Sequence, residues 1–320
     1  MMPDDTPFFI VGAGRSGTTL LRLILSAHSR LHILPETWFI LDLVKEMPLN
    51  AALSRAQVKR ATDIMTADYR WPDMEIDPDV LRDRAGQLAM PRLADILNLV
   101  YLEHLSRAGK SRFGDKTPTY IRIVPQLATI YPGARFIHLI RDGRDVAISR
   151  IRLGWERYYE RTKFEWTLAM EKRREYAVSA YAGRIMEVRY EQLVDHLEAT
   201  VQEICSFLGE RYEPTMLSWQ HLTTLIPDRE RHIHGKIAEP VSGATLAGWR
   251  HKLNAIECFA MEACLYRDLV QLGYPLRFSH PLWRPLLDLT GAAMHGAAPW
   301  LAPGVAALKR RNLLPKSAHL

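Results

Sequence analysis

The sequence contains few cysteines, and they form no recognisable pattern. Its 320 residues include three, Cys205, Cys258 and Cys264, without a CxxC pair or the spacing of a disulfide framework. Redox motifs, zinc sites and secreted disulfide-rich domains all require such spacing. We therefore expect buried, small apolar thiols in a protein of a reducing compartment.

Export signals and long apolar runs are also absent. The N-terminus, MMPDDTP, has acidic residues where a signal peptide needs basic ones, and the apolar run that follows is short. No segment from Met1 to Phe278 is long and apolar enough to span a bilayer. No basic stripe with interleaved aromatics appears, so nucleic acid is a poor candidate partner. These absences favour a cytoplasmic protein.

The composition that remains is that of a globular protein with a sizeable core. Hydrophobic residues make up 48% and charged residues 24% of the chain, as in ordinary soluble domains. The formal net charge of +6 favours anionic ligands or surfaces without identifying them.

Short apolar runs alternate with longer amphipathic ones. The predicted buried strands are Phe8–Val11, Leu31–Leu34, Arg135–Ile140 and Ile185–Val188, with a short one reaching Gly114. The predicted helices cover about 17–28, 84–107, 162–182, 196–208 (ended by Gly209) and 253–272. Strands alternating with helices predict right-handed βαβ units. The expected fold is therefore a three-layer α/β/α sandwich with a mostly parallel central sheet.

The last part of the chain differs from the rest. Residues 1–278 are predicted to form the main domain, and 279–320 an alanine- and proline-rich extension with a basic tail. Within it, residues 289–308 carry no formal charge and precede Lys309, Arg310 and Arg311. Pro299 and Pro303 interrupt any spanning helix. The open alternatives are peripheral membrane contact through 289–311 and packing on the domain or on a second subunit.

The stretch FFIVGAGRSGTTL at residues 8–20 has the layout of a phosphate-binding loop. Gly12 and Gly17 keep the G-x-x-x-x-G spacing, which lets backbone N–H groups converge on one oxyanion at a helix N-terminus. Thr18 stands where such loops place the lysine that holds an ATP phosphate. Arg15 inside the loop offers a forked cation, and Thr19 a second hydroxyl. A sulfuryl group carries less charge than a terminal phosphate and would need less compensation.

A second anion site is predicted in RFIHLIRDGRDVAISR. Arg141 follows a buried strand, where open α/β sheets bind ligands. Ser149 lies about two helical turns further on and can face the same crevice. The alternative is that Arg141 and Asp142 form only local ion pairs.

Together, GAGRSGTTLL and RFIHLIRDGRDVAISR resemble the PAPS-dependent sulfotransferases, and most of all the bacterial branch that is similar to protein-tyrosine sulfotransferases. The resemblance covers about residues 7–275. It implies that PAPS (3′-phosphoadenosine 5′-phosphosulfate) is the co-substrate and that the loop is a P-loop-like phosphosulfate-binding loop. The implied residues are Arg15, Ser16, Gly17, Thr18 and Thr19 for the 5′-phosphosulfate, and Arg141 and Ser149 for the 3′-phosphate.

Sulfuryl transfer to a hydroxyl needs a general base. Glu36 follows the second predicted strand beside Leu34, Trp38 and Phe39, whose apolar character is expected to raise its pKa. Its spacing from the loop arginine is similar to that of the catalytic glutamate in the tyrosine-sulfotransferase branch. The alternative is a carboxylate at a helix N-terminus.

Histidine is the base in the cytosolic branch, so His28 and His32 compete with Glu36. We interpret His28 as a capping or packing group and His32 as an exposed residue of a strand.

A candidate acid stands in RFGDKTPT at residues 112–119. A cation there can stabilise charge on the leaving oxygen, and the resemblance gives this role to Lys116. It also places Tyr190 near the nucleotide, where adenine stacking and core packing are the alternatives. The tyrosine-sulfotransferase branch has a lysine where this chain has Gly248. The substitutes considered are Lys236 and Arg250.

The sequence thus predicts a metal-independent sulfotransferase that moves a sulfuryl group from PAPS to an acceptor hydroxyl. The alternatives are a nucleotide-dependent kinase and a non-catalytic nucleotide- or anion-binding module. Residues 40–110 are expected to form a helical cap that selects the acceptor, whether glycan, lipid, peptide or small metabolite.

Overall fold

Five parallel strands form the centre of the protein in the order β2-β3-β1-β4-β5. Their bounds are β1 Phe8–Gly12, β2 Leu31–Leu34, β3 Arg112–Lys116, β4 Arg135–Ile140 and β5 Ile185–Arg189. The computed structural model describes residues 6–154, 160–235, 237–238, 243 and 246–279. Within it the chain divides into two compact units. The first comprises 1–140 and 172–243, with the whole sheet, and the second 141–171 and 244–320.

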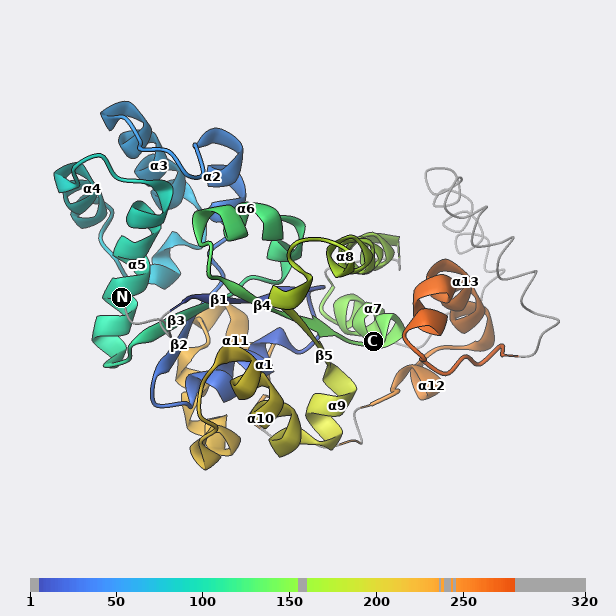
Figure 1. Ribbon diagram of the computed structural model, residues 1–320. Coiled ribbons are helices and arrows are strands. Elements are labelled where there is room, and N and C mark those ends of the chain that lie inside the picture. The colour runs from blue at the N-terminus through green and yellow to red at the C-terminus, as the bar shows by residue number, and fades with distance from the viewer. Residues whose placement is uncertain (1–5, 155–159, 236, 239–242, 244–245, 280–320) are drawn as a thin grey trace. The chain divides into compact units, whose positions relative to one another are not determined.

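Helices cover both faces of the sheet in the first unit, as Figure 1 shows. On one face lie α1 Thr18–Ser26, α9 Tyr190–Asp195 and α10 Leu197–Leu208, and on the other α5 Leu93–Ala108 and α6 Val124–Ile130. A core of fully buried side chains joins β1 to α1, among them Phe8, Ile10 and Leu21. On the opposite face, Phe9 stacks on Phe136 at 5.6 Å between ring centroids. The prediction of a three-layer fold with a parallel sheet is confirmed.

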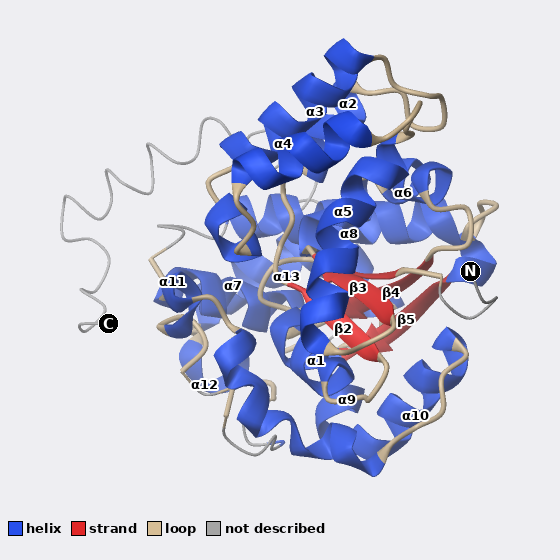
Figure 2. Cartoon of the chain, turned by 90° about the vertical axis from the view of Figure 1, so that its left-hand side faces the viewer, coloured by secondary structure: helices blue, strands red, loops and turns tan. Residues whose placement is uncertain are grey.

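The segment between β2 and β3, which includes the residues of the expected cap, is helical. It contains α2 Ile40–Glu46, α3 Arg55–Ala67, the 3₁₀ helix η1 Trp71–Met74, α4 Pro78–Gln87 and α5. Figure 2 shows α2, α3 and α4 gathered together beyond α5. Local sequence explains where these helices start, because Ser54 forms a capping box with Gln57, and Asp77 accepts from the first turn of α4.

Several predicted boundaries need correction. The helix predicted over 84–107 covers the end of α4 and most of α5, because the backbone leaves the helix at Leu88, which is extended, and Met90 before Pro91 has a φ of +51°. The helix predicted over 162–182 is α8 Glu160–Ala177, and the strand predicted to reach Gly114 continues to Lys116. The other strands and α10 lie within one residue of their predicted bounds.

The remaining elements of the first unit are shorter. They are the 3₁₀ helices η2 Pro118–Arg122, η3 Ala182–Arg184 and η4 Pro214–Leu225, and the one-turn helix α11 Asp228–Arg231. The second unit contains α7 Gly143–Arg152, α12 Trp249–Lys252 and α13 Ala255–Gln271. Of the helices in the described ranges, none has both the length and the apolarity needed to cross a membrane. The predicted extension, from residue 280 on, lies outside the described residues.

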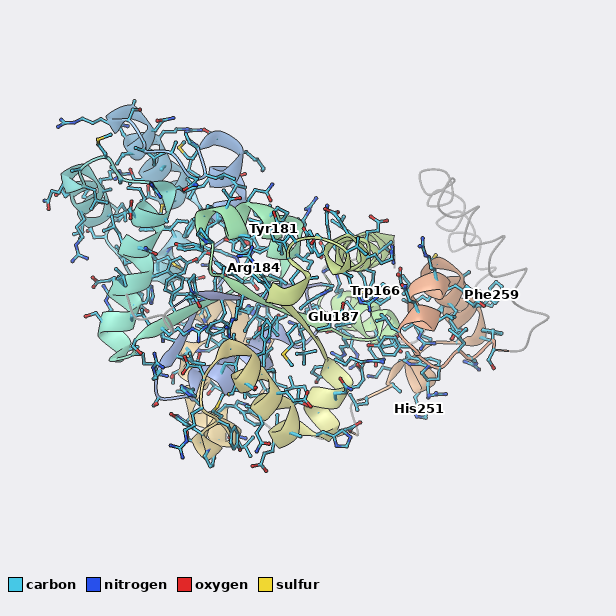
Figure 3. The ribbon with its side chains drawn as sticks, viewed as in Figure 1. Trp166, Tyr181, Arg184, Glu187, His251 and Phe259 are labelled. Atoms are coloured by element: carbon cyan, nitrogen blue, oxygen red, sulfur yellow. The ribbon has the colours of Figure 1, made fainter. Side chains whose placement is uncertain are left out.

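Two histidines of the sheet are buried, and one of them corrects an expectation. His32 on β2 is only 8% exposed, so it is not the surface residue that strand alternation suggested. Its ring stacks on that of His104 from α5. Burial, then the charges of neighbouring basic groups, lowers the pKa of His32 to about 3. His138 on β4 is 1% exposed, and burial, then Arg173, lowers its pKa to about 3. Figure 3 labels Glu187 on β5, the ion-pair partner of Arg173.

These histidines predict a loss of stability in mild acid. The pKa values of both histidines in the folded state lie below the ordinary 6.5. As the pH falls below 6.5, these histidines therefore become protonated in the unfolded chain while they stay neutral in the folded protein, which favours unfolding. Each histidine should remove about 1 kcal/mol of unfolding free energy per pH unit in this range. Urea unfolding at pH 7 and pH 5 measures the loss, and His138→Gln should reduce it. The control is His251→Gln, at an exposed position of α12 (Figure 3). An unchanged pH dependence in His138→Gln would contradict the assignment.

Candidate functional site

The strand register brings three predicted site segments to the carboxyl edge of the sheet. Ile10 of β1 pairs with Lys116 of β3, and Leu34 of β2 pairs with Asp115. The glycine-rich loop after β1 and Glu36 after β2 therefore leave the sheet beside Lys116. In parallel sheets this edge is where ligands bind.

The loop backbone has the conformation that an oxyanion cradle needs. Gly17 has a φ of +96°, and a Cβ there would lie 2.4 Å from the Tyr190 ring, so only glycine fits. Arg15 also has a positive φ, +74°, and its guanidinium donates to the carbonyl of Ile233 at 3.2 Å. The Ser16 hydroxyl is buried, and no described residue hydrogen-bonds to it. A buried, unsatisfied hydroxyl in a glycine turn is suited to binding an anionic group.

Glu36 and Lys116 form a direct ion pair. The Lys116 ammonium donates to Glu36 Oε1 at 2.7 Å, and the Trp38 indole donates to Oε2 at 2.6 Å. Arg70, just before η1, lies 3.3 Å from Oε2. Lys116 is 1% exposed, which makes an ordinary surface role impossible. The carboxylate thus has a partner on each oxygen.

The expectation of a raised pKa at Glu36 is wrong in this structure. Burial does raise the pKa, but the charges of Lys116 and Arg70 and the hydrogen bonds to that carboxylate outweigh it and lower the pKa to about 2. The sequence suggested only the apolar neighbours. Lys116, the larger contributor, was itself a predicted site residue, whereas Arg70, the second contributor, comes from the segment between β2 and β3, 34 positions after Glu36.

A buried polar network fixes the segment that carries Glu36. Asp115 accepts hydrogen bonds from the hydroxyls of Thr37, Tyr101 and Thr117. The backbone N–H of Thr37 donates to Thr117 at 3.0 Å. Burial raises the pKa of Asp115 to about 6. Because Thr37 follows Glu36 and Asp115 precedes Lys116, the network holds the two candidate residues in register.

Sequence reasoning missed a charged cluster on the cap side. Arg70 also binds Glu230 of α11 at 2.5 Å, and Arg229 donates to Asp73 of η1 at 3.0 Å. Each pair links residues about 160 positions apart, so no local pattern could have revealed it. The competing histidines have structural contacts. His28 is buried and its ring hydrogen-bonds to the Arg211 carbonyl at 2.9 Å, which confirms its packing role.

The second unit carries Arg141 and Ser149. Arg141 precedes α7, and its carbonyl accepts from the Trp166 indole at 2.9 Å (Figure 3 labels Trp166). Ser149 lies on α7 and is half-buried. Asp142 caps α7 and binds Arg144 at 2.7 Å. Arg141 therefore directly precedes the cap of α7 and Ser149 lies on that helix, so both residues belong to the same short segment of the second unit.

The position of Gly248 shows which cation stands near it. A Cβ at Gly248 would lie 2.7 Å from the Lys252 ammonium and 3.5 Å from Asp145. Arg250 instead lies over the Trp249 ring, at 4.6 Å. Lys236 lies outside the described residues. Lys252, not considered from the sequence, therefore fills the space that a side chain at 248 would enter.

The fold and its glycine loop define a class: α/β proteins with a P-loop-like anion-binding loop. A family model described as "Sulfotransferase family" matches residues 7–214, well over half of the chain. The chain belongs to the sulfotransferase family.

Two relatives and one solved structure illustrate the similarity. Protein-tyrosine sulfotransferase 2 of Gallus gallus is 28% identical over 291 residues, 85% of this chain and 72% of its own length. A protein of Aquifex aeolicus is 26% identical over 227 residues, 68% of this chain but only 27% of its own length. The sulfotransferase domain of the Synechococcus PCC 7002 olefin synthase superposes with a TM-score of 0.61 at 21% identity, covering 84% of this chain and 95% of that domain. This structural similarity shows that the chain and the olefin synthase domain share a fold.

Proposed function

We propose that the protein transfers a sulfuryl group from PAPS to an acceptor hydroxyl. The observation that carries the proposal is the Glu36–Lys116 pair, 2.7 Å apart, at the strand edge from which the glycine loop also leaves. A carboxylate can accept a proton and an ammonium can stabilise a departing phosphate, so the pair supplies both charges that the transfer needs.

The loop residues fit the phosphosulfate end of PAPS. The buried Ser16 hydroxyl, the amides around Gly17 and the guanidinium of Arg15 are donors, and the first residues of α1, Thr18 and Thr19, add two hydroxyls. A sulfuryl group in such a cradle requires no lysine at Thr18 because its charge is lower than that of a terminal phosphate.

The residues then act in sequence. Glu36 takes the proton of the acceptor hydroxyl, whose oxygen forms a bond to sulfur as the bond from sulfur to the bridging oxygen breaks. The electron pair of that bond leaves with adenosine 3′,5′-bisphosphate (3′,5′-ADP), where Lys116 and Arg15 compensate it. As Lys116 turns from Glu36 toward the leaving oxygen, the carboxylate loses its strongest partner and its pKa rises. Positioning and preorganised charge supply most of the acceleration.

The residues that bind the remaining parts of PAPS are assigned from the family resemblance. We propose that Arg141 and Ser149 bind the 3′-phosphate and that Tyr190 lies near the nucleotide. The contact between Tyr190 and Gly17 supports the second assignment, because it places this ring against the loop itself.

The acceptor is a hydroxylated molecule selected by the helical cap of residues 40–110. The Arg70 guanidinium lies over the Trp38 and Tyr69 rings, at 5.7 and 5.3 Å, so aromatic and cationic groups stand beside Glu36. The chicken relative is named for tyrosine in proteins. The acceptor classes that we retain for this chain are a glycan, a lipid, a peptide and a small metabolite. We retain a cytoplasmic location, peripheral membrane contact through 289–311 and a homodimer as proposals.

Transfer of labelled sulfate from PAPS to a panel of hydroxylated acceptors, in EDTA and in magnesium, tests the function. Transfer in EDTA supports it. Phosphoryl transfer from ATP that needs magnesium would instead identify a kinase, and nucleotide binding without any transfer a binding module.

A further inference from the structure

His234 lies against the glycine loop, although this residue itself was assigned no role from the sequence. It follows α11, and its Nε2 lies 3.4 Å from the hydroxyl of Thr19, the second residue of α1. The preceding residue, Ile233, accepts the hydrogen bond from Arg15. The turn after α11 thus contacts both a cation and a hydroxyl that the proposed function gives to the phosphosulfate.

Charged groups from four elements face the His234 ring. They are Arg15 from the loop, Lys116 from β3, Glu230 from α11 and Glu36 after β2. Glu230 is near enough to pair with the ring, 3.9 Å from Nε2. The ring is therefore surrounded by opposing charges whose balance an incoming anion would alter.

In the unliganded protein this balance favours the neutral imidazole. Burial, then the charges of Arg15 and Lys116, lowers the pKa of His234 to about 4, while Glu230 and Glu36 oppose the shift. An anion in the loop would compensate the two cations and add a third negative charge, so every change it brings favours the imidazolium. Opposite charges within a few ångströms raise a histidine pKa by about 1–3 units.

We propose that His234 is a further donor-side binding residue that takes up a proton when an anionic phosphate or phosphosulfate enters the glycine loop. The inference rests on the proposed function. The proton comes from solvent and completes the imidazolium, which donates to the anion, while the Thr19 hydroxyl is released to donate to it as well. His234 then adds a positive charge where the loop lacks its lysine.

Calorimetric titration with 3′,5′-ADP tests this without any need for turnover. At pH 6, in buffers of different ionisation enthalpy, the slope of the observed enthalpy gives the protons exchanged. The wild type should take up a measurable fraction of a proton more than His234→Gln, because the imidazole is more protonated in the complex than in the free protein. Ionisation of the nucleotide's own phosphates cancels in this difference. The matched control is His232→Gln, at an exposed position two residues earlier, which should keep the wild-type slope.

The sign of the pH dependence follows from the same linkage. Because binding raises the pKa, the contribution of His234 to affinity is fully present only below the free pKa of about 4 and is lost as the pH rises from there through the bound pKa. The wild type should lose more affinity between pH 6 and pH 8 than His234→Gln. Should that variant fold poorly, the NMR shift of the His234 ring Cε1 proton, followed during titration, reports protonation directly.

Each outcome decides one claim. Binding of 3′,5′-ADP with equal proton uptake in wild type and His234→Gln, or with no change at the ring, overturns the His234 proposal alone. Absence of 3′,5′-ADP binding overturns the proposed function and this inference with it.

Discussion

Glu36→Gln is expected to lower sulfuryl transfer by about 10²–10⁴-fold, the usual contribution of a positioned general base. The amide keeps the size of the side chain and can still contact Lys116, but it cannot accept the proton of the acceptor. Affinity for 3′,5′-ADP should change little, because the proposed contacts to the nucleotide come from the loop, Arg141 and Ser149. Initial rates with PAPS, measured beside calorimetric titration of the same preparations, separate the two effects.

Glu230→Gln is the matched control. Glu230 is also mostly buried and binds the same Arg70, but it lies on α11, and the ion pair of Lys116 is with Glu36. We expect its effect on transfer to stay below about tenfold, as for a group that lacks a proton-transfer role. Equal losses in the two variants would show that the carboxylates matter for charge balance alone and would contradict the assignment of the base.

Arg144→Met is expected to be the most destabilising substitution of a charged residue in the second unit. Arg144 is fully buried and binds Asp142 and Glu262 at 2.7 and 2.6 Å. It also stacks on the Trp249 ring at 3.6 Å. Removing one partner of a buried ion pair leaves a buried charge uncompensated and costs about 3–5 kcal/mol of unfolding free energy. Urea unfolding monitored by tryptophan fluorescence measures the change.

The same helix offers the control. Arg150→Met breaks the pair with Glu165, whose side chain is 36% exposed and stays hydrated when the arginine is lost, so its cost should be smaller than that of Arg144→Met. Adding Glu262→Met to Arg144→Met should recover part of the stability, because the double variant no longer buries the Glu262 carboxylate without its arginine partner. Arg144→Met no less stable than Arg150→Met would contradict this account of the unit.

The strands and the loop could be predicted because their signals are local. Phe8–Gly12 is a continuous buried run with glycines directly after it, and β4 is similar. The positions of Glu36 and Lys116 follow from parallel strands ending at one edge. One error also had a local origin. Hydrophobic periodicity continued across Pro91, whereas the backbone leaves the helix after Gln87 and becomes helical again only at Leu93.

The charge environment of the site could not be predicted in this way. The low pKa of Glu36 depends first on Lys116 and then on Arg70, and Arg70 is in turn hydrogen-bonded to Glu230, 160 residues later in the chain. His234 contacts Thr19 over a separation of 215 residues. Such pairs exist only once the cap and α11 are placed in three dimensions, and neither periodicity nor spacing in the sequence contains that information.

The most direct test of the central claim is calorimetric titration with 3′,5′-ADP in EDTA, for the wild type and Arg141→Ala. We predict binding that persists in EDTA and weakens by about 10–100-fold in the variant, the effect of losing charge-assisted hydrogen bonds to a phosphate. Arg152→Ala, at the far end of α7, should bind as the wild type does. Absence of 3′,5′-ADP binding, together with magnesium-dependent binding of ATP, would contradict the account.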